Sequence, residues 1–474
     1  MSQERAQRIH EATMRILRDT GMRFLHPDAI AILKDHGIRV EGNIAYFTED
    51  QIMEWVGKAP SSAALFALNP NLDVTLKHNQ TINAPAAGPT FVLDPDGRMR
   101  DAQIEDYFKM LKLYEANPSY GINGGVPCQP KGIPTEWSTL LLHFAALQLT
   151  QKPLWVGTGT YRQMEATVEL TKRRFCTTDD ELRAHPRILT IVNTNTPLQL
   201  DLNMTETMLT ALKYRQPLVV ASAAMAGLTS PVTIAGTIAL TNAEVISAIA
   251  FAQMAAPGAP VVYGSQSSGA DLRTGSICIG SPEAALCYKY AGEMARFYGI
   301  PSRAGGSLTD AKKVDAQAGY ESMMTYSACL DGDVSVVFQS AGVLDSYLAA
   351  SFEKMIVDFE IIDYVTRYRS EFEVDMDTVP EDVIEEVGHG GQYLVEDHTL
   401  DFCHIDPLTP NISVRGSIEN PLEAFDLNIA KRMDQLLASY EKPHMERDVF
   451  ESMAAVVREC GIEEGLIEKL IVQQ

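Results

Sequence analysis

The residues best suited to chemistry in this 474-residue chain lie in loops that follow short apolar runs. These loops are rich in Gly, Ser, Thr and Asn and poor in charge. The charged exceptions are Asp201, Asp271, Arg273, Asp310, Lys312 and Asp345. The acidic ones can instead cap the helices that follow, because a carboxylate accepts hydrogen bonds from the first backbone N–H groups of a helix. The loops therefore offer few side chains for acid–base catalysis.

Aromatic side chains also lie on or beside the ends of the apolar runs. They are Phe91, Tyr120, Trp155, Tyr161, Tyr263 and Phe338. One interpretation is packing in the core and between helices. The other is a cage for a quaternary ammonium group, which aromatic faces attract through the cation–π interaction. The periodicity of the sequence does not choose between the two.

Other familiar signatures are weak. His389, in the sequence GHGG, has an exposed, loop-like context and can be a surface residue, a substrate contact or a metal ligand. It is nine residues from His398, which is six from His404, so the chain lacks the i, i+4 histidine pair of a zinc helix. The run GTGTYR at 157–162 lacks the third glycine of a dinucleotide-binding loop.

Eight short runs of apolar or β-branched residues are the strands that must position these loops. They start 30 to 43 residues apart, each is followed by a helical pattern, and they span 82–88, 120–125, 153–159, 187–194, 217–223, 260–266, 300–306 and 334–340. This spacing is typical of strand–helix units. Eight in series predict an α/β fold of the (β/α)8 TIM barrel type, with a doubly wound open sheet as the structural alternative.

The flanks of the barrel are expected to be helical. Helical patterns at 3–19, 27–36 and 49–56 predict an N-terminal helical extension over 1–78. The catalytic barrel then covers 79–370. The chain becomes acidic and helical beyond it, which predicts a C-terminal helical extension over 371–474.

Composition excludes several classes of protein. Lys and Arg number 39 against 62 Asp and Glu, so the formal charge of −23 disfavours binding to nucleic acid or anionic membranes. Seven scattered cysteines without a CxxC motif favour a reducing cytoplasm. The stretch 216–243 carries no charge, but prolines and glycines interrupt it. We interpret it as a buried strand, a loop and the start of a buried helix, and expect no membrane span.

Several segments together resemble the trimethylamine methyltransferase family. They are VVYGSQSSGADLRTG at 261–275, the run from SPEAAL to AGYES at 281–322, GINGG at 121–125 and VGHGGQYLVEDHT at 387–399. The resemblance covers nearly the whole chain, and DAKKVDAQAGYE is its most specific part. It implies a (β/α)8 barrel that transfers a methyl group to a cobalt corrinoid carried by a separate protein.

One departure from the family decides the expected substrate. The archaeal trimethylamine enzymes carry pyrrolysine in or beside the position of AGGSLTDAK (304–312), where this chain has Ser307, Leu308 and Thr309. Family members without pyrrolysine resemble glycine betaine methyltransferase and its relatives for carnitine or proline betaine. Their chemistry is sensible, because a quaternary ammonium releases a neutral amine and needs no acid. The chain is therefore expected to act on a quaternary amine, with glycine betaine favoured, in one-carbon metabolism.

The resemblance and the loops together give a set of expected site residues. Phe91, Trp155, Tyr263 and Phe338 are expected to hold the ammonium group. Gln266, Arg303 and His389 are expected to bind the substrate carboxylate or its water. Ser307, Leu308, Asp310 and Lys312 form the expected catalytic loop, at the position of pyrrolysine in relatives.

Cobalamin is expected to arrive with a corrinoid partner protein, because the chain has no DxHxxG motif, and no metal is expected to bind directly. A homodimer is plausible. Two rival functions stay open at this point. One is a metal-dependent lyase or hydrolase in which Asp271, Asp310 and Glu206 meet around a divalent ion. The other is a non-catalytic protein that binds betaine.

Overall fold

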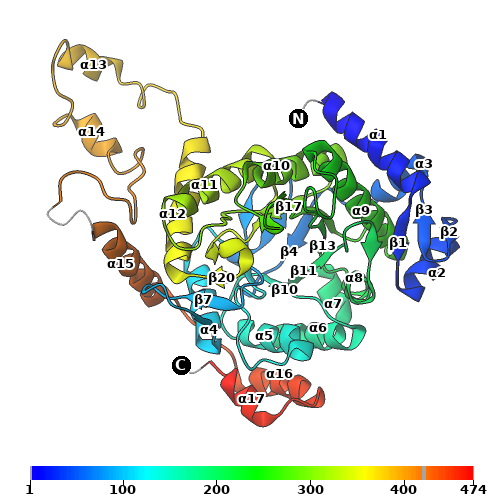
Figure 1. Ribbon diagram of the computed structural model, residues 1–474. Helices are drawn as coiled ribbons and strands as arrows, with labels where there is room; N and C mark the ends of the chain where they lie inside the picture. Colours follow the sequence, from blue (N-terminus) through cyan, green and yellow to red (C-terminus); the bar gives the residue numbers. More distant parts are fainter. Residues whose placement is uncertain (1–2, 419–422, 473–474) are drawn as a thin grey trace.

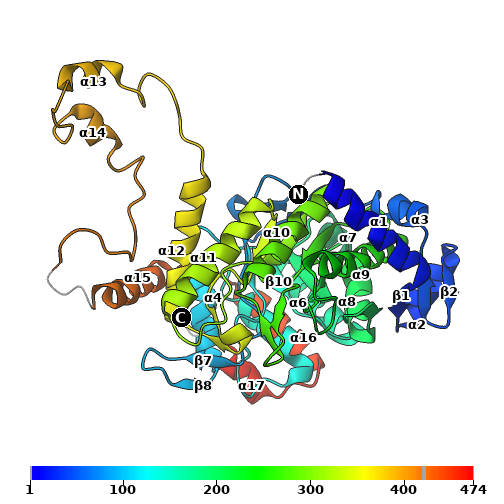
Figure 2. The same cartoon turned by 45° about the horizontal axis from the view of Figure 1, so that its top comes forward.

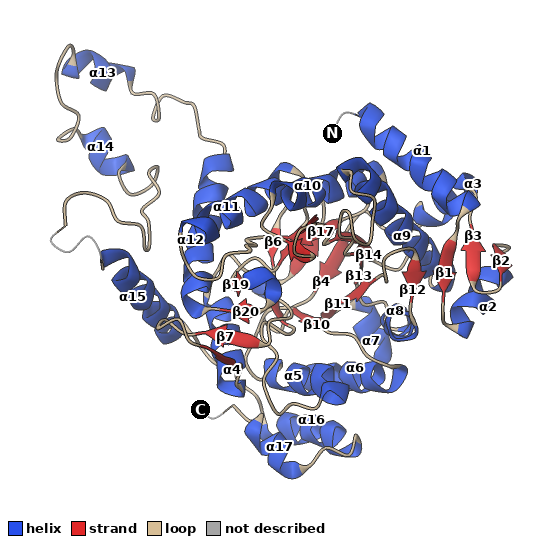
Figure 3. Cartoon of the chain, in the orientation of Figure 1, coloured by secondary structure: helices blue, strands red, loops and turns tan. Residues whose placement is uncertain are grey.

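A parallel eight-stranded sheet forms the centre of the computed structural model, which describes residues 3–418 and 423–472. In chain order the strands are β6 (Ile82–Asn83), β9 (Asn123–Gly124), β10 (Leu154–Val156), β11 (Ile188–Asn193), β13 (Leu218–Ser222), β14 (Val261–Ser265), β17 (Ser302–Gly305) and β18 (Val336–Phe338). Their order around the sheet is β6-β18-β17-β14-β13-β11-β10-β9. A parallel bridge from Asn83 to Tyr120 joins the two ends. All eight predicted strands are thus present, and they form a closed (β/α)8 barrel (Figure 3).

Helices surround the barrel on its outer side (Figure 1). The eight that follow the strands are α4 (Ile104–Ala116), α5 (Ser138–Ala146), α6 (Tyr161–Phe175), α8 (Leu202–Lys213), α9 (Ile234–Ala255), α10 (Pro282–Phe297), α11 (Ala316–Asp331) and α12 (Phe352–Arg369). A short α7 (Asp179–Ala184) precedes β11. The start of α10 shows how local sequence fixes these bounds, because Ser281 caps the helix and Pro282 takes its first position.

Helix α9 explains the long uncharged stretch of the sequence. Residues 216–243 form β13, a loop and the first half of α9, as predicted. Among the described residues, α9 is the one helix long and apolar enough to span a bilayer by length and composition. Most of it is buried, because it packs against α1, α3 and α10 as well as β13 and β14.

The N-terminal segment is not purely helical, which corrects the expectation for 1–78. It contains the helices α1 (Gln3–Asp19), α2 (Pro27–Asp35) and α3 (Glu49–Val56) and the strands β1 (Met22–Phe24), β2 (Arg39–Glu41) and β3 (Ile44–Tyr46). These strands join β12 (Gln199–Leu200) in a second sheet, ordered β12-β1-β3-β2. The predicted domain boundaries themselves stay a prediction.

A hairpin closes the bottom of the barrel, where the strands begin. It consists of β4 (Ala63–Leu65), the 3-10 turn η1 (Pro70–Leu72) and β5 (Val74–Leu76). Leu65 and Leu76 pack in one apolar cluster with residues that line the barrel, such as Leu189 and Val262. The amide of Phe66 also donates to Pro186 O at 2.7 Å, just before β11. The bottom is therefore filled by apolar side chains.

Short hairpins lie at the opposite end of the barrel, where the strands end and where the active sites of such barrels are found. A four-stranded sheet there contains β7 (Phe91–Leu93), β8 (Met99–Asp101), β19 (Val343–Leu344) and β20 (Ala349–Ala350). The turn between β19 and β20 includes η3 (Asp345–Tyr347), and β14 is followed by the hairpin β15 (Gly269–Asp271) and β16 (Ser276–Cys278). A 3-10 turn, η2 (Thr135–Trp137), precedes α5.

The C-terminal part divides into a projecting arm and a returning set of helices. The arm, residues 370–416, holds α13 (Glu381–Val387) and α14 (Asp397–Phe402) and extends away from the barrel before it returns to α12 at residues 411–413 (Figures 1 and 2). The helices α15 (Ala424–Ser439), α16 (Arg447–Glu459) and α17 (Glu464–Lys469) then return, with α15 against α4 and α12 and α16 against α6.

Candidate functional site

Three side chains from strands β10, β17 and β18 meet inside the barrel. The rings of Trp155 and Phe338 meet edge to face, with their centroids 5.6 Å apart and an interplanar angle of 81°. The Cζ atom of Arg303 lies 5.3 Å from the centroid of the Phe338 ring. All three are buried, with exposed fractions of 5%, 0% and 2% for Trp155, Phe338 and Arg303. The sequence therefore named three residues that the fold brings together.

The guanidinium of Arg303 is a buried cation without an acidic partner. It donates from Nη1 to Ser265 O at 3.3 Å and from Nη2 to the side-chain oxygen of Gln339 at 2.8 Å, and Nε has no acceptor. No carboxylate among the described residues forms an ion pair with it. Burial lowers the pKa of Arg303, yet an arginine stays charged in a protein. A buried cation is normally paired, so an anion from outside fits this position.

Gln266 adds a further polar group next to Arg303. Its Nε2 donates to the hydroxyl of Tyr288 at 3.2 Å, while Oε1 has no partner. Gly305 leaves room for the Gln266 side chain, because a Cβ at residue 305 would lie 2.3 Å from Gln266 Nε2. Trp155 Nε1 is another buried atom without a hydrogen-bond partner. Since buried polar atoms are nearly always hydrogen-bonded, these unpaired atoms indicate a place for a polar ligand or water.

Gly125, the last residue of the GINGG motif, positions Trp155. Its φ is +68°, and a Cβ at this position would lie 1.6 Å from Cε2 of the Trp155 ring. The indole can therefore lie directly against the backbone of residue 125 only because the side chain is absent.

We expect Gly125→Ala to displace the Trp155 ring. The variant adds an overpacking cost of about 1–3 kcal/mol to the cost of a positive φ, so its melting temperature falls and its tryptophan fluorescence changes. Gly132→Ala is the matched control, because Gly132 has a φ of +85° but no atom within 4 Å of a Cβ. Equal losses of stability in the two variants, with unchanged fluorescence, contradict the positioning role.

The expected catalytic loop lies beside this cluster, but its charged groups face elsewhere. Asp310 accepts hydrogen bonds from the amides of Ile279 and Gly280 at 3.0 and 3.1 Å and from the Ser346 hydroxyl at 2.6 Å. Lys312 forms an ion pair with Asp345. Both residues therefore brace the neighbouring turn, and the catalytic role expected of them stays a prediction.

The uncharged half of the expected catalytic loop is buried. Ser307 and Leu308 have no exposed surface. The Ser307 hydroxyl has no hydrogen-bond partner, and its carbonyl oxygen accepts from Lys354 Nζ at 3.4 Å. Lys354 is itself buried in an ion pair with Asp358, whose pKa burial raises to about 6. Of the four expected catalytic residues, these two stay candidates for lining the site.

Two expected cage residues lie outside the barrel interior. Tyr263 is in β14 between the inward-facing Val262 and Gly264, so it points outward. There its hydroxyl donates to Asn242 Oδ1 at 3.0 Å and its ring stacks on Tyr298. Phe91 is in β7 and packs in the separate apolar cluster of Leu344 and Ala349. The structure therefore places neither ring beside Trp155 and Phe338.

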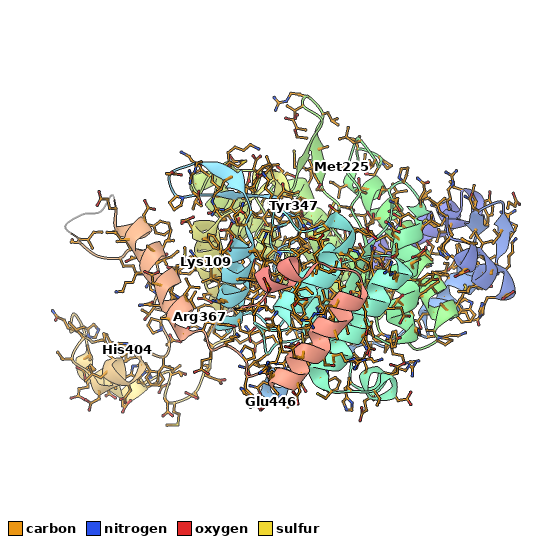
Figure 4. The ribbon with its side chains drawn as sticks, turned by 90° about the horizontal axis from the view of Figure 1, so that it is seen from below. Lys109, Met225, Tyr347, Arg367, His404 and Glu446 are labelled. Atoms are coloured by element: carbon orange, nitrogen blue, oxygen red, sulfur yellow. The ribbon has the colours of Figure 1, made fainter. Side chains whose placement is uncertain are left out.

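His389 is also remote from the cluster. It follows α13 in the projecting arm, where its side chain is exposed. Figure 4 places His404 of the same arm outside the barrel, apart from Tyr347. The structure therefore does not bring His389 together with Arg303 and Gln266, and its binding to the substrate carboxylate stays a prediction.

The acidic residues of the rival metal site do not come together. Asp271 pairs with Arg273 in the β15–β16 hairpin, and Asp310 braces the turn described above. Glu206 accepts the amide of Tyr161 at 2.6 Å and lies 3.6 Å from His26 Nε2. Across residues 3–418 and 423–472, no group of three or more His, Cys, Asp or Glu is placed to hold a metal ion.

The mouth of the barrel is open beside β11 and β13. Asn193 at the end of β11 and Ala223 just after β13 are exposed, although the alternation of their strands turns them toward the barrel axis. Three large aliphatic side chains lie on the adjoining loops, with exposed fractions of 47% for Leu228, 62% for Val232 and 60% for Leu272. We call Leu228, Val232 and Leu272 the apolar rim.

Sequence reasoning missed two residues next to Arg303. Gln339, which binds the guanidinium, has a φ of +51°, and Tyr347 has a φ of +77°. Left-handed backbone is uncommon in residues with a Cβ and collects at functional sites. Gln and Tyr are not residue types that favour a left-handed backbone, so the sequence gives no signal for this conformation.

Comparison with known proteins gives a consistent result over the full length. The model of the family described as trimethylamine methyltransferase matches residues 1–460. Glycine betaine methyltransferase of Desulfitobacterium hafniense (strain Y51) is 34% identical over 469 residues, which is 98% of both chains. L-carnitine:corrinoid methyltransferase of Eubacterium limosum is 28% identical over 77% of this chain and 76% of its own.

The solved structures agree on the fold. The monomethylamine methyltransferase of Methanosarcina barkeri superimposes with a TM-score of 0.56 at 11% sequence identity, over 99% of this chain and 88% of that one. At this identity the likeness concerns the arrangement of the chain alone.

Proposed function

Because the chain belongs to the trimethylamine methyltransferase family, we propose that it transfers a methyl group from a quaternary ammonium carboxylate to the Co(I) atom of a corrinoid protein. Glycine betaine is the substrate that we favour among carnitine, proline betaine and glycine betaine. The relatives named for these three compounds support the reaction class, and the site supports the choice of a zwitterion.

The observation that carries this proposal is the unpaired buried Arg303. Its free Nε–H and its charge suit a carboxylate, which arginine binds with planar, charge-assisted hydrogen bonds. A cation that lacks a carboxylate meets the same positive charge and is repelled. The site therefore favours a zwitterion over a simple methylamine.

The aromatic pair supplies the other half of the recognition. Aromatic faces attract a desolvated quaternary ammonium. The Trp155 and Phe338 rings pack against each other, and Arg303 lies over the Phe338 ring. This short separation suits glycine betaine, in which a single methylene joins the nitrogen to the carboxylate. Neutral rings also hold the ammonium without an anion, whose attraction fades as the positive charge is lost in the transition state.

The corrinoid supplies a Co(I) nucleophile when its carrier docks. The mouth suits the docking of such a carrier, because it is open beside Asn193 and Ala223. The apolar rim flanks it, and exposed apolar surface of this kind is typical of protein interaction sites. The chain's own residues orient the methyl group and exclude water from it, which are the contributions that a displacement reaction needs from a protein.

Methyl transfer with reduced cobalamin tests this function. We expect the purified chain to convert glycine betaine to dimethylglycine, with one methylated cobalamin formed for each betaine consumed. Omitting either the chain or the cobalamin abolishes the reaction. Binding of betaine without any transfer favours the rival binding protein. Turnover that needs a divalent ion and no corrinoid favours the rival lyase or hydrolase.

Two further expectations remain proposals. The arm at 370–416 exposes large apolar side chains, among them Phe372, Met376, Leu394 and Ile405, and such a surface supports a homodimer. A cytoplasmic location is supported by the seven cysteines, which are all free thiols in the structure.

A further inference from the structure

The turn between β19 and β20 holds three consecutive residues in an unusual conformation. Asp345, Ser346 and Tyr347 have φ values of +50°, +52° and +77°. The left-handed region places the Cβ atom too close to the following carbonyl oxygen, so runs of non-glycine residues avoid it. A turn of this kind persists only where its surroundings hold it, and such turns gather at functional sites.

The surroundings of this turn do hold it. Lys312 forms an ion pair with Asp345, and the Ser346 hydroxyl donates to Asp310 Oδ1 at 2.6 Å. The amide of Asp345 donates to Ala311 O at 2.9 Å. On either side, β19 pairs with β20 through Val343–Ala350 and Leu344–Ala349. The loop at 309–312 and the flanking hairpin thus fix the turn that bears Tyr347.

The fixed turn directs the Tyr347 hydroxyl toward the Arg303 cluster. The hydroxyl is buried and has no hydrogen bond of normal geometry. Burial raises the pKa of Tyr347, and the nearby charge of Arg303 and the amide of Gln266 act in the opposite direction. Hydrogen bonds connect the turn to this region, because Asp310 Oδ1 accepts both the Ser346 hydroxyl and the amide of Ile279. The Tyr288 hydroxyl donates to Ile279 O at 3.3 Å and accepts from Gln266 Nε2 at 3.2 Å. In Figure 4, Tyr347 lies on the side of the barrel that also carries Met225, which follows β13.

The unpaired hydrogen-bond donors beside Arg303 are complementary to a carboxylate. Arg303 Nε and the Tyr347 hydroxyl can both donate, and among the described residues neither has an acceptor in normal hydrogen-bond geometry. Two donors that converge beside a buried cation match the two oxygens of a carboxylate.

We propose that Tyr347 is a specificity-determining residue, held by the 345–347 turn so that its hydroxyl donates a hydrogen bond to the substrate carboxylate bound at Arg303. This inference rests on the proposed function and adds a residue to its site. It also gives Asp310 and Lys312 a positioning role, through the turn that they brace.

Tyr347→Phe tests the inference, because it removes the hydroxyl and keeps the ring and the turn. Calorimetric titration of the full chain with glycine betaine is expected to show an increase in Kd of about tenfold, with an unchanged melting temperature. In the methyl-transfer assay with reduced cobalamin, the KM for glycine betaine rises by a similar factor, while kcat changes less. The affinity for choline, a quaternary ammonium without a carboxylate, stays the same.

Tyr263→Phe is the matched control, since Tyr263 is a buried tyrosine of the same barrel whose hydroxyl points outward. We expect it to lower the melting temperature and leave the Kd for glycine betaine unchanged. An unchanged Kd in Tyr347→Phe overturns the inference, and so does an equal loss of affinity for choline. If wild type binds glycine betaine without transferring a methyl group, the proposed function falls while the Tyr347 titration still decides the inference. If wild type binds none of glycine betaine, carnitine and proline betaine, both fall.

Discussion

Arg303→Met is expected to lower methyl transfer from glycine betaine by about 100-fold or more, since truncating one partner of a buried charge pair costs about 2–5 kcal/mol. The substrate carboxylate then loses the guanidinium with which we propose that it pairs. The fold, by contrast, is expected to tolerate the change, with a melting temperature close to that of wild type. Burying an unpaired guanidinium is itself costly, and its removal offsets the loss of its bonds to Gln339 and Ser265. Steady-state kinetics and thermal unfolding measure the two effects.

Two further variants sharpen this test. Arg303→Lys keeps the charge but loses the planar fork, so its activity is expected to lie between those of wild type and Arg303→Met. Arg296→Met removes an arginine that pairs with Asp333 on the outer side of the barrel, and its activity is expected to match wild type. Full activity in Arg303→Met, or unfolding of that variant, contradicts a substrate-binding role for Arg303.

The second large effect concerns the leaving group. With reduced cobalamin supplied, glycine betaine, carnitine and proline betaine are expected to react at least about 1,000-fold faster than trimethylamine and dimethylglycine, the factor that about 4 kcal/mol in the barrier represents. The quaternary compounds release a neutral amine. The tertiary amines must keep a proton on nitrogen to do so, and the Trp155, Phe338 and Arg303 side chains offer no carboxylate to hold it. Arg303 moreover repels the trimethylammonium cation.

The rates of cobalamin methylation by these five amines test the leaving-group prediction. Trimethylamine reacting as fast as the best quaternary compound contradicts the leaving-group argument. A preference for carnitine or proline betaine among the quaternary compounds leaves the mechanism intact and corrects the choice of glycine betaine.

The barrel could be predicted from the sequence because each of its units repeats the same local signals. A run such as 217–223 is apolar on both faces, ends in small polar residues and precedes a helical pattern, and the structure contains eight strands that are each followed by a helix. The strands β1, β2 and β3 of the N-terminal segment escaped prediction because they stand outside the repeating strand–helix units. They are three residues long, so alternation cannot mark them, whereas the equally short β10 and β18 were recognised by the repeat to which they belong.

The site could be predicted only in part, for a reason that Tyr263 illustrates. Knowing that a residue lies near the end of a strand does not reveal which face it occupies. Alternation normally gives the face, but barrel strands are apolar on both sides, so Tyr263 and Trp155 looked equivalent. The structure turns Trp155 inward and Tyr263 outward. Tyr347 was out of reach because its place depends on backbone dihedral angles and on ties to Asp310 and Lys312.

The hairpin of β4 and β5, which fills the bottom of the barrel, also dictates an order of events. With that end filled, a quaternary amine and a docking corrinoid carrier would share the opening at the other end. For the proposed function we therefore expect betaine to enter before the carrier docks, and the demethylated amine to leave after the carrier departs. Compulsory-order kinetics would follow, with inhibition by a carrier that docks on an empty barrel.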